Sequence, residues 1–164
     1  MTGRADEVLQ YCDSYSRMGT LVDLADELSR DDWHAVLGRE WSCCDNIGAY
    51  RATLRRLLPT HGPVRPMMTA DEQAAYDALP ERITVYRGCD THNMRGASWS
   101  LDRDVARRFP FLMRYRAARP LLVTATVLKS RVLALKLDRS ETEVITFHAR
   151  QTRLEALGVE VTTS

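Results

Sequence analysis

The sequence lacks an excess of charge of either sign. Its 164 residues include 23 lysines and arginines and 22 aspartates and glutamates, which gives a formal net charge of +1. A surface that is nearly neutral overall does not attract polyanions over its whole area. The composition therefore argues against general nucleic-acid binding, while it leaves a local basic patch open.

Cysteine and histidine are scarce, with four residues each. Since 45% of the residues are hydrophobic, the chain can build a core without a disulfide framework, and we expect reduced thiols. Cys43 and Cys44 are adjacent, but no second pair follows at zinc-type spacing, and the histidines form no HxH or HxxxH pattern. A metal site would need long-range assembly, and we expect none.

Long hydrophobic runs are missing as well. The N-terminal stretch MTGRADEVLQYCDSYS alternates charged and apolar residues, unlike a signal peptide or a membrane span. We therefore expect a soluble cytoplasmic protein without membrane association. The length suits a single compact unit.

The first half of the chain has helical periodicity. Ser29 offers a capping side chain, and Thr69 with Glu72 matches a capping box at the start of a short helix. The segment 60–66, THGPVRP, is the clearest break and is predicted to be a surface connection. The predicted helical segments are 5–17 with Gly19 as its stop, 20–28, 29–37, a helix over 47–58 capped by Asp45, and 69–79. Residues 1–80 are thus predicted to form a helical lobe.

After Pro80 the periodicity becomes alternating and the residues become β-branched and aromatic, as is typical of strands. One helix, from Asp102 to Phe109, interrupts this half and ends or bends at Pro110. The predicted strands are 83–86, 121–128, 132–137, 144–147 and, as a further candidate, 158–163. The predicted fold class is α+β, with the helical lobe followed by a mostly antiparallel sheet core over 81–164.

Three short motifs in the second half contain residue types used in catalysis. They are VYRG with Arg87 and Gly88, GASWS with Ser98, Trp99 and Ser100, and SETEV with Glu141 and Glu143. Alternation along a strand puts residues two apart on the same face, which pairs the two serines and the two glutamates. Two carboxylates on one face raise the pKa of at least one of them unless a cation such as Arg87 compensates. Taken singly, these residues are better explained as a solvated strand edge, a surface charge and turn-forming serines.

The order of the three motifs resembles the ADP-ribosyltransferase family in its arginine, serine, glutamate branch, which includes bacterial toxins, phage enzymes and vertebrate arginine-specific transferases. The matching motifs are Tyr86-Arg87-Gly88, Ser98-Trp99-Ser100 and Glu141-Thr142-Glu143. ASWSLDRDVARRF is similar to the family's serine strand and the helix that follows it. The resemblance covers Glu81 to Val161 and implies that family's β core. It departs at Trp99, where threonine is usual, and in the helical first half, which lies outside the minimal fold.

The resemblance implies that NAD is the ADP-ribose donor and that its bond between nicotinamide and ribose breaks through an oxocarbenium-like transition state. Glu143 would bind the ribose 2′-hydroxyl and place negative charge beside the developing cation. Arg87 would bind the diphosphate or the adjoining ribose, and Gly88 would hydrogen-bond the nicotinamide amide through its backbone. Ser98 would orient Glu143, with Ser100 in support.

Glu141 would select the acceptor. In the resembling family a glutamate at this position accompanies arginine modification, and a protonated guanidinium needs a carboxylate that orients it and takes its proton. The partner implied is a protein target of unknown identity that presents an arginine. The loop 137–140, with Arg139 and Ser140 at its tip, would recognise that target.

Aromatic residues have two explanations each. Trp99 and Phe109 could stack against nicotinamide, but Phe109 also lies on the apolar stripe of its helix, which favours core packing. Trp33 and Trp41 are predicted to belong to the core of the helical lobe. The arginines between 103 and 119 could contact phosphates on the adenine side of the donor or an acidic partner, but the interspersed Asp102 and Asp104 favour a solvated face.

The expected function is therefore an NAD-dependent mono-ADP-ribosyltransferase of a phage or other mobile element. One alternative is an NAD glycohydrolase, in which water replaces the protein acceptor. The other is a protein without turnover that binds and inhibits a host protein on the same fold, because fold does not fix function.

Overall fold

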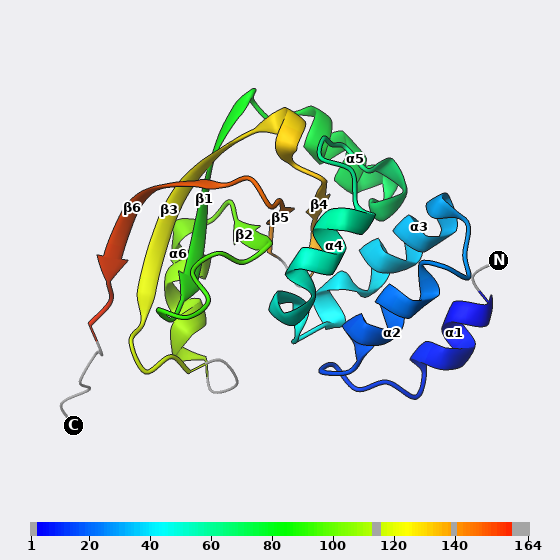
Figure 1. Ribbon diagram of the computed structural model, residues 1–164. Helices are drawn as coiled ribbons and strands as arrows, with labels where there is room; N and C mark the ends of the chain where they lie inside the picture. Colours follow the sequence, from blue (N-terminus) through cyan, green and yellow to red (C-terminus); the bar gives the residue numbers. More distant parts are fainter. Residues whose placement is uncertain (1–2, 113–115, 139–140, 159–164) are drawn as a thin grey trace.

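A computed structural model describes residues 3–112, 116–138 and 141–158. It is an α+β structure in which a helical N-terminal half packs beside a six-stranded antiparallel sheet (Figure 1). No helix in the described part of the chain is long and apolar enough to cross a membrane.

The helical half contains five α-helices joined by short turns. They are α1 (Gly3–Leu9), α2 (Arg17–Leu24), α3 (Arg30–Glu40), α4 (Arg51–Leu57) and α5 (Ala70–Asp77), with the 3-10 turns η1 (Trp41–Cys43), η2 (Ile47–Tyr50) and η3 (Arg65–Met67). Two predicted caps are confirmed. The Ser29 hydroxyl accepts the Asp32 N–H at 3.2 Å, and Thr69 and Glu72 form a complete capping box at the start of α5.

Three predictions for this half are wrong. The predicted helix 5–17 stops at Leu9, because the Asp13 carboxylate accepts the Ser16 N–H at 2.7 Å and forms a turn, so Gly19 lies inside α2. Asp45 does not cap the next helix, since Asn46 occupies the cap position and makes no side-chain cap bond. The segment 60–66 is a surface connection only in part, because its buried Val64 donates its N–H to the Leu133 carbonyl at 2.7 Å.

The sheet has the strand order β4-β5-β2-β1-β3-β6, and all neighbouring strands are antiparallel. The strands are β1 (Arg82–Cys89), β2 (Ser98–Ser100), β3 (Leu121–Leu128), β4 (Ala134–Lys136), β5 (Glu143–Ile145) and β6 (Arg150–Ala156). Four predicted strands are thus confirmed, 121–128 with the predicted ends and the other three with shifted ends. β6 escaped prediction because it is an edge strand whose residues are almost all exposed. Of the candidate strand 158–163, Gly158 is not in a strand and the rest lies outside the described residues.

Two layers cover the sheet. Valines and alanines of β1 and β3, among them Val85, Val123 and Ala125, join residues of the helical half in one hydrophobic cluster. The predicted helix at Asp102 to Phe109 is confirmed as α6 (Arg103–Arg108), which the Asp102 carboxylate caps; it packs against β1 and is followed by η4 (Phe109–Phe111). Its buried Ala106 lies outside that cluster. The hydrophobic cluster therefore joins both halves of the chain, and α6 adds a separate layer.

A buried ion pair fixes α5 to the edge of the sheet. Lys136 Nζ in β4 lies 2.9 Å from Glu72 Oε2 and donates to the Met67 carbonyl at 3.0 Å, and both charged side chains are almost fully buried. Glu72 Oε1 also accepts the Leu137 N–H at 3.1 Å. This contact holds the end of β4, from which the chain leads to Glu141 and Glu143.

Candidate functional site

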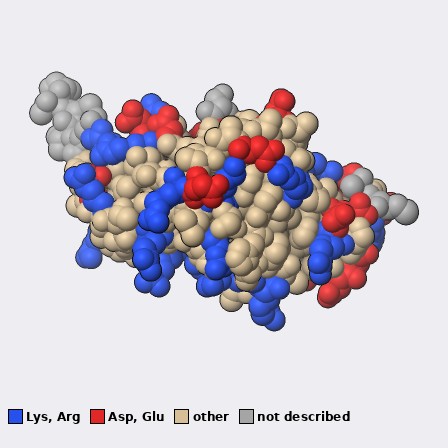
Figure 2. Space-filling model, turned by 90° about the horizontal axis from the view of Figure 1, so that it is seen from above, with Lys and Arg blue, Asp and Glu red and all other residues tan. Residues whose placement is uncertain are grey.

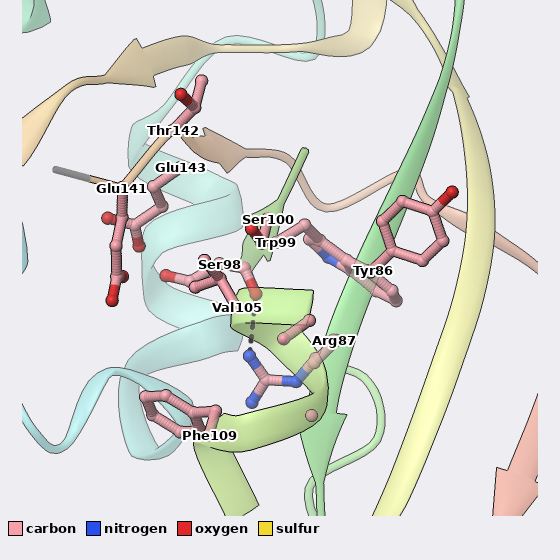
Figure 3. Close-up of a pocket in the computed structure, with 12 residues that line it drawn as sticks. Tyr86, Arg87, Ser98, Trp99, Ser100, Val105, Phe109, Glu141, Thr142 and Glu143 are labelled. Atoms are coloured by element: carbon pink, nitrogen blue, oxygen red, sulfur yellow. Dashed lines mark hydrogen bonds between the residues drawn. The ribbon is translucent and has the colours of Figure 1, made fainter. Parts of the chain in front are cut away.

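The three motifs meet in one pocket of about 100 Å³ (Figure 3). The strand order explains why, because β5, β2 and β1 are neighbours and the register pairs Ser100 with both Tyr86 and Glu143. α6 and the start of η4 close the other side. The pocket is lined by Tyr86, Arg87, Gly88, Ser98, Trp99, Ser100, Val105, Ala106, Phe109, Glu141, Thr142 and Glu143. Every site residue predicted from the sequence is thus in this lining.

Glu143 is the most closely held carboxylate of the pocket. Its Oε1 accepts the indole N–H of Trp41 at 3.2 Å, and that N–H also donates to Ser98 Oγ at 3.0 Å. Burial raises the pKa of Glu143 above the ordinary value, although hydrogen bonds from Ser98 and Trp41 act to lower it. The nearby charges of Glu141 and Asp138 raise it further. The expected mutual effect of the two glutamates is therefore present, but burial contributes more.

Arg87 is half-buried in the wall of the pocket and forms no hydrogen bond or ion pair with either glutamate. Its Nη1 donates to the Ser98 carbonyl at 2.8 Å and its Nε donates to the Asn93 carbonyl at 3.0 Å. Within the described part of the chain it forms no ion pair and its Nη2 has no hydrogen bond. Burial lowers the pKa of Arg87, and the charge of Glu143 acts in the opposite direction. The guanidinium therefore does not neutralise the carboxylates by contact, and it keeps one edge for a ligand.

Two glycines allow this close packing. A Cβ on Gly96 would overlap the Arg87 guanidinium, and a Cβ on Gly88 would overlap the Ala106 carbonyl and the Pro110 ring. Gly88 thus lets α6 approach β1. Its predicted role toward a nicotinamide amide stays a prediction.

The aromatic residues and Ser100 differ from one another in their surroundings. Trp99 is buried and donates its indole N–H to the Gly96 carbonyl at 3.0 Å. Phe109 is half-buried and lines the pocket outside the hydrophobic cluster, so core packing does not describe it. The Ser100 hydroxyl accepts the Asp102 N–H and donates to the Asp102 carbonyl, both at 3.0 Å, as a turn-forming serine does. In Figure 3 the Tyr86 ring points away from Arg87.

Glu141 is exposed and precedes β5, which begins at Glu143. Its N–H donates to the Asp138 carbonyl at 3.1 Å in a turn. Glu141 and Glu143 are therefore not two residues of one strand, and the prediction that strand alternation pairs them is wrong. Their side chains still extend in the same direction over the pocket (Figure 3). Arg139 and Ser140, the predicted tip of the recognition loop, lie outside the described residues.

Trp41 is the residue that the sequence interpretation missed. It was assigned to the core of the helical lobe, and it is fully buried there, yet its N–H reaches Ser98 and Glu143. A buried indole N–H requires an acceptor, which is the one general signal in the sequence. The acceptor in β5 lies 102 residues later, so no local pattern could identify it. Trp33 matches the core assignment, since its N–H donates to the Leu21 carbonyl at 2.7 Å.

The site thus combines a half-buried carboxylate held by neutral donors, an exposed carboxylate beside it and a guanidinium across the pocket. No group of three or more His, Cys, Asp or Glu residues in the described ranges could hold a metal ion. Comparison with family models, curated proteins and solved structures gave no match. The function of this site must therefore be inferred from the chemistry of these side chains.

Proposed function

We propose that this protein is an NAD-dependent mono-ADP-ribosyltransferase with the β core of the arginine, serine, glutamate branch, and that it modifies an arginine of a target protein. The observation that supports this function is the meeting of Arg87, Ser98 and Glu143 in one pocket, from three different strands. Such a convergence is not expected of three unrelated surface motifs.

From the size of the pocket we infer which part of the donor enters it and which part stays outside. Its volume of about 100 Å³ is below the roughly 300 Å³ of a pocket that encloses a whole ligand, so it accepts one ring-sized group. The nicotinamide enters beside Phe109, and the diphosphate stays outside, within reach of the free edge of Arg87. A planar guanidinium suits a diphosphate because it donates two parallel hydrogen bonds.

Glu143 provides the transition-state stabilisation. As the bond between C1′ of the ribose and the nicotinamide nitrogen breaks, its electron pair leaves with nicotinamide and positive charge develops on the ribose. The carboxylate accepts the 2′-hydroxyl and lies beside this charge, an interaction that strengthens in the transition state. The neutral donors Trp41 and Ser98 hold the carboxylate in place without cancelling its charge, which a cation in contact would do.

Glu141 receives the acceptor. It is exposed beside the pocket, where an arginine of another protein can reach it. The acceptor nitrogen forms the new bond to C1′ and loses one proton, which Glu141 accepts. A half-buried carboxylate for the donor and an exposed one for the acceptor match the two halves of a transfer reaction.

The test is release of nicotinamide from NAD, with and without cell extract, by wild type and three glutamate variants. Glu143→Gln should lower release about 100- to 1000-fold, as for loss of one key electrostatic group. Glu141→Gln should lower labelling of an arginine in the extract and spare NAD hydrolysis. Glu81→Gln, an exposed glutamate outside the pocket, is the matched control and should change neither.

The outcomes separate the functions. Release that requires extract and labels a protein band supports transfer. Full release without any acceptor identifies a glycohydrolase. Absence of release under every condition, together with NAD binding that Glu143→Gln leaves unchanged, would contradict both enzymatic functions and favour a binding protein.

A further inference from the structure

A second pocket, of about 420 Å³, lies between α4, the loop before β2 and the start of β6. Of the described residues, Trp99 alone lines both pockets. α6 contributes to the first pocket only, whereas the second is lined by Val123, which belongs to the hydrophobic cluster. The second pocket therefore lies on the far side of Trp99 from α6.

Basic side chains dominate the polar lining of this pocket. Arg51, Arg95, Arg150 and His148 line it, and no Asp or Glu of the described residues does so. In Figure 2, Lys and Arg side chains predominate along the left and middle of the lower edge of the molecule, and Asp and Glu side chains reach that edge at the right. The first pocket has the opposite character, with two glutamates and one arginine.

These arginines have no ion-pair partner among the residues that the structure describes. Within the described ranges, Arg51, Arg95 and Arg150 take part in no salt bridge, and Arg51 Nη1 instead donates to the Arg95 carbonyl at 2.7 Å. Burial lowers the pKa of Arg51, and the positive charges of Arg55 and Arg95 lower it further. Like charges gathered in a cavity repel one another and destabilise the folded protein, and a bound anion offsets this repulsion.

The geometry selects the kind of anion. Several guanidinium groups around one cavity match a phosphate, which accepts paired hydrogen bonds from each. The floor is apolar, because Trp99 and Phe147 are buried, and the Arg51 guanidinium lies 5.4 Å from the centre of the Phe147 ring. The volume falls in the range of about 300 to 1,000 Å³ that encloses a small ligand.

We propose that this second pocket is a binding site for a phosphate-bearing small molecule about the size of a mononucleotide, separate from the pocket that holds Glu143. The phosphate contacts Arg95 and Arg150, whose side chains are exposed and able to close over it, and the remainder of the ligand lies over the apolar floor. This site goes beyond the proposed transfer reaction and does not depend on it.

The test is calorimetric titration of the full chain with pyrophosphate, AMP and adenosine at low salt. AMP and pyrophosphate should bind saturably and adenosine should not, because phosphate is the recognised group. The double variant with Arg95→Ala and Arg150→Ala should weaken AMP binding at least about tenfold, since each charge-assisted hydrogen bond contributes about 1.5–3 kcal/mol. The matched control, with Arg30→Ala and Arg82→Ala, removes two exposed arginines outside the pocket and should bind AMP as wild type does.

Location is tested separately, because Trp99 lines the pocket. AMP should change the tryptophan fluorescence of wild type, and Trp99→Phe should abolish this change while AMP still binds. Three outcomes overturn the proposal: no saturable binding of AMP or pyrophosphate, equal weakening in the control variant, or displacement of AMP by NAD in a simple competition. The last result would make this pocket part of the donor site. Glu143→Gln should bind AMP normally, so failure of the proposed transfer reaction leaves this test intact.

Discussion

Two glutamates, the buried Glu72 and the half-buried Glu143, lie at the junction between the helical half and the sheet, and they are held in opposite ways. Glu72 in α5 accepts hydrogen bonds from Lys136 Nζ, from the Thr69 N–H and from the Leu137 N–H. Glu143 in β5 has only the indole of Trp41 and the hydroxyl of Ser98 nearby as donors, and no cation in contact within the described residues. Lys136 and Glu143 are register partners on adjacent strands, so the two regions are immediate neighbours.

The different surroundings of Glu72 and Glu143 shift the pKa values of their carboxyl groups in opposite directions. Burial acts to raise the pKa of both carboxyls. At Glu72 the bonds from Lys136, Thr69 and Leu137 outweigh burial, and its pKa lies below the ordinary value. At Glu143 burial wins and its pKa lies above that value. A carboxylate matched with a cation stabilises the fold, whereas one held by neutral donors keeps its charge available for a substrate, as at catalytic sites.

The largest expected effect comes from removing the cation of the first region. Lys136→Met leaves the Glu72 carboxylate buried and unpaired, which should lower the free energy of unfolding by about 3–5 kcal/mol at neutral pH. Urea denaturation measures it. Adding Glu72→Gln to Lys136→Met should restore part of the loss, because no unpaired charge then remains. Wild-type stability in the single variant would show that the pair does not hold α5 to β4.

Removing the charge of the second region should have the opposite effect on stability. In Glu143→Gln, nicotinamide release should fall by the amount given above, about 2.7–4 kcal/mol in activation free energy. The folded protein should be as stable as wild type or more so at pH 7, because a raised pKa means that ionisation disfavours the folded state. Urea denaturation of this variant at pH 7 decides between the signs, and a clear loss of stability would refute the contrast with Glu72.

The stability of the wild type should depend on pH in two opposing ways. The contribution of Glu72, whose pKa is lowered in the folded state, is present above its ordinary value of 4.5 and is lost as the pH falls through the folded pKa. The penalty from Glu143 develops as the pH rises from 4.5 through its raised pKa. Comparing urea denaturation of wild type and Glu143→Gln across pH isolates the second contribution, which should vanish at low pH.

A smaller effect is expected from removing the indole donor. Trp41→Phe keeps most of the packing and removes the N–H that lowers the pKa of Glu143. Nicotinamide release should therefore fall about tenfold, and the acid limb of its pH profile should move to higher pH. Trp33→Phe is the matched control, because it removes a buried indole hydrogen bond of its own, to Leu21. Equal pH profiles in the two variants would mean that Trp41 serves packing alone.

The smallest effect concerns a neutral contact of the first region. Thr69→Ala removes the hydroxyl that accepts the Glu72 N–H and should cost about 1 kcal/mol of stability, typical of a lost helix cap. Activity should not change, since Lys136 still fixes Glu72. Thermal unfolding and the nicotinamide assay, run on the same preparation, check both statements.

The sequence predicts those parts of the structure that are determined locally. Capping at Ser29 and Thr69 follows from neighbouring residues, and the strand 121–128 from its β-branched and apolar residues. The meeting of Arg87, Ser98 and Glu143 needed the motif order in addition, since no local pattern brings β1, β2 and β5 together. Contacts between distant segments were missed, as at Trp41 and at the second pocket, where residues from α4, the loop before β2 and β6 converge.

The packing of Arg87 against Gly96 has a consequence for how relatives of this chain could be recognised. A side chain at position 96 would displace the guanidinium from its present place, so a relative that holds the arginine in the same way is expected to keep the glycine, although the two lie in different segments. A search profile that requires Arg87-Gly88 together with Gly96 two positions before Ser98 would therefore select chains that share this arrangement of the guanidinium.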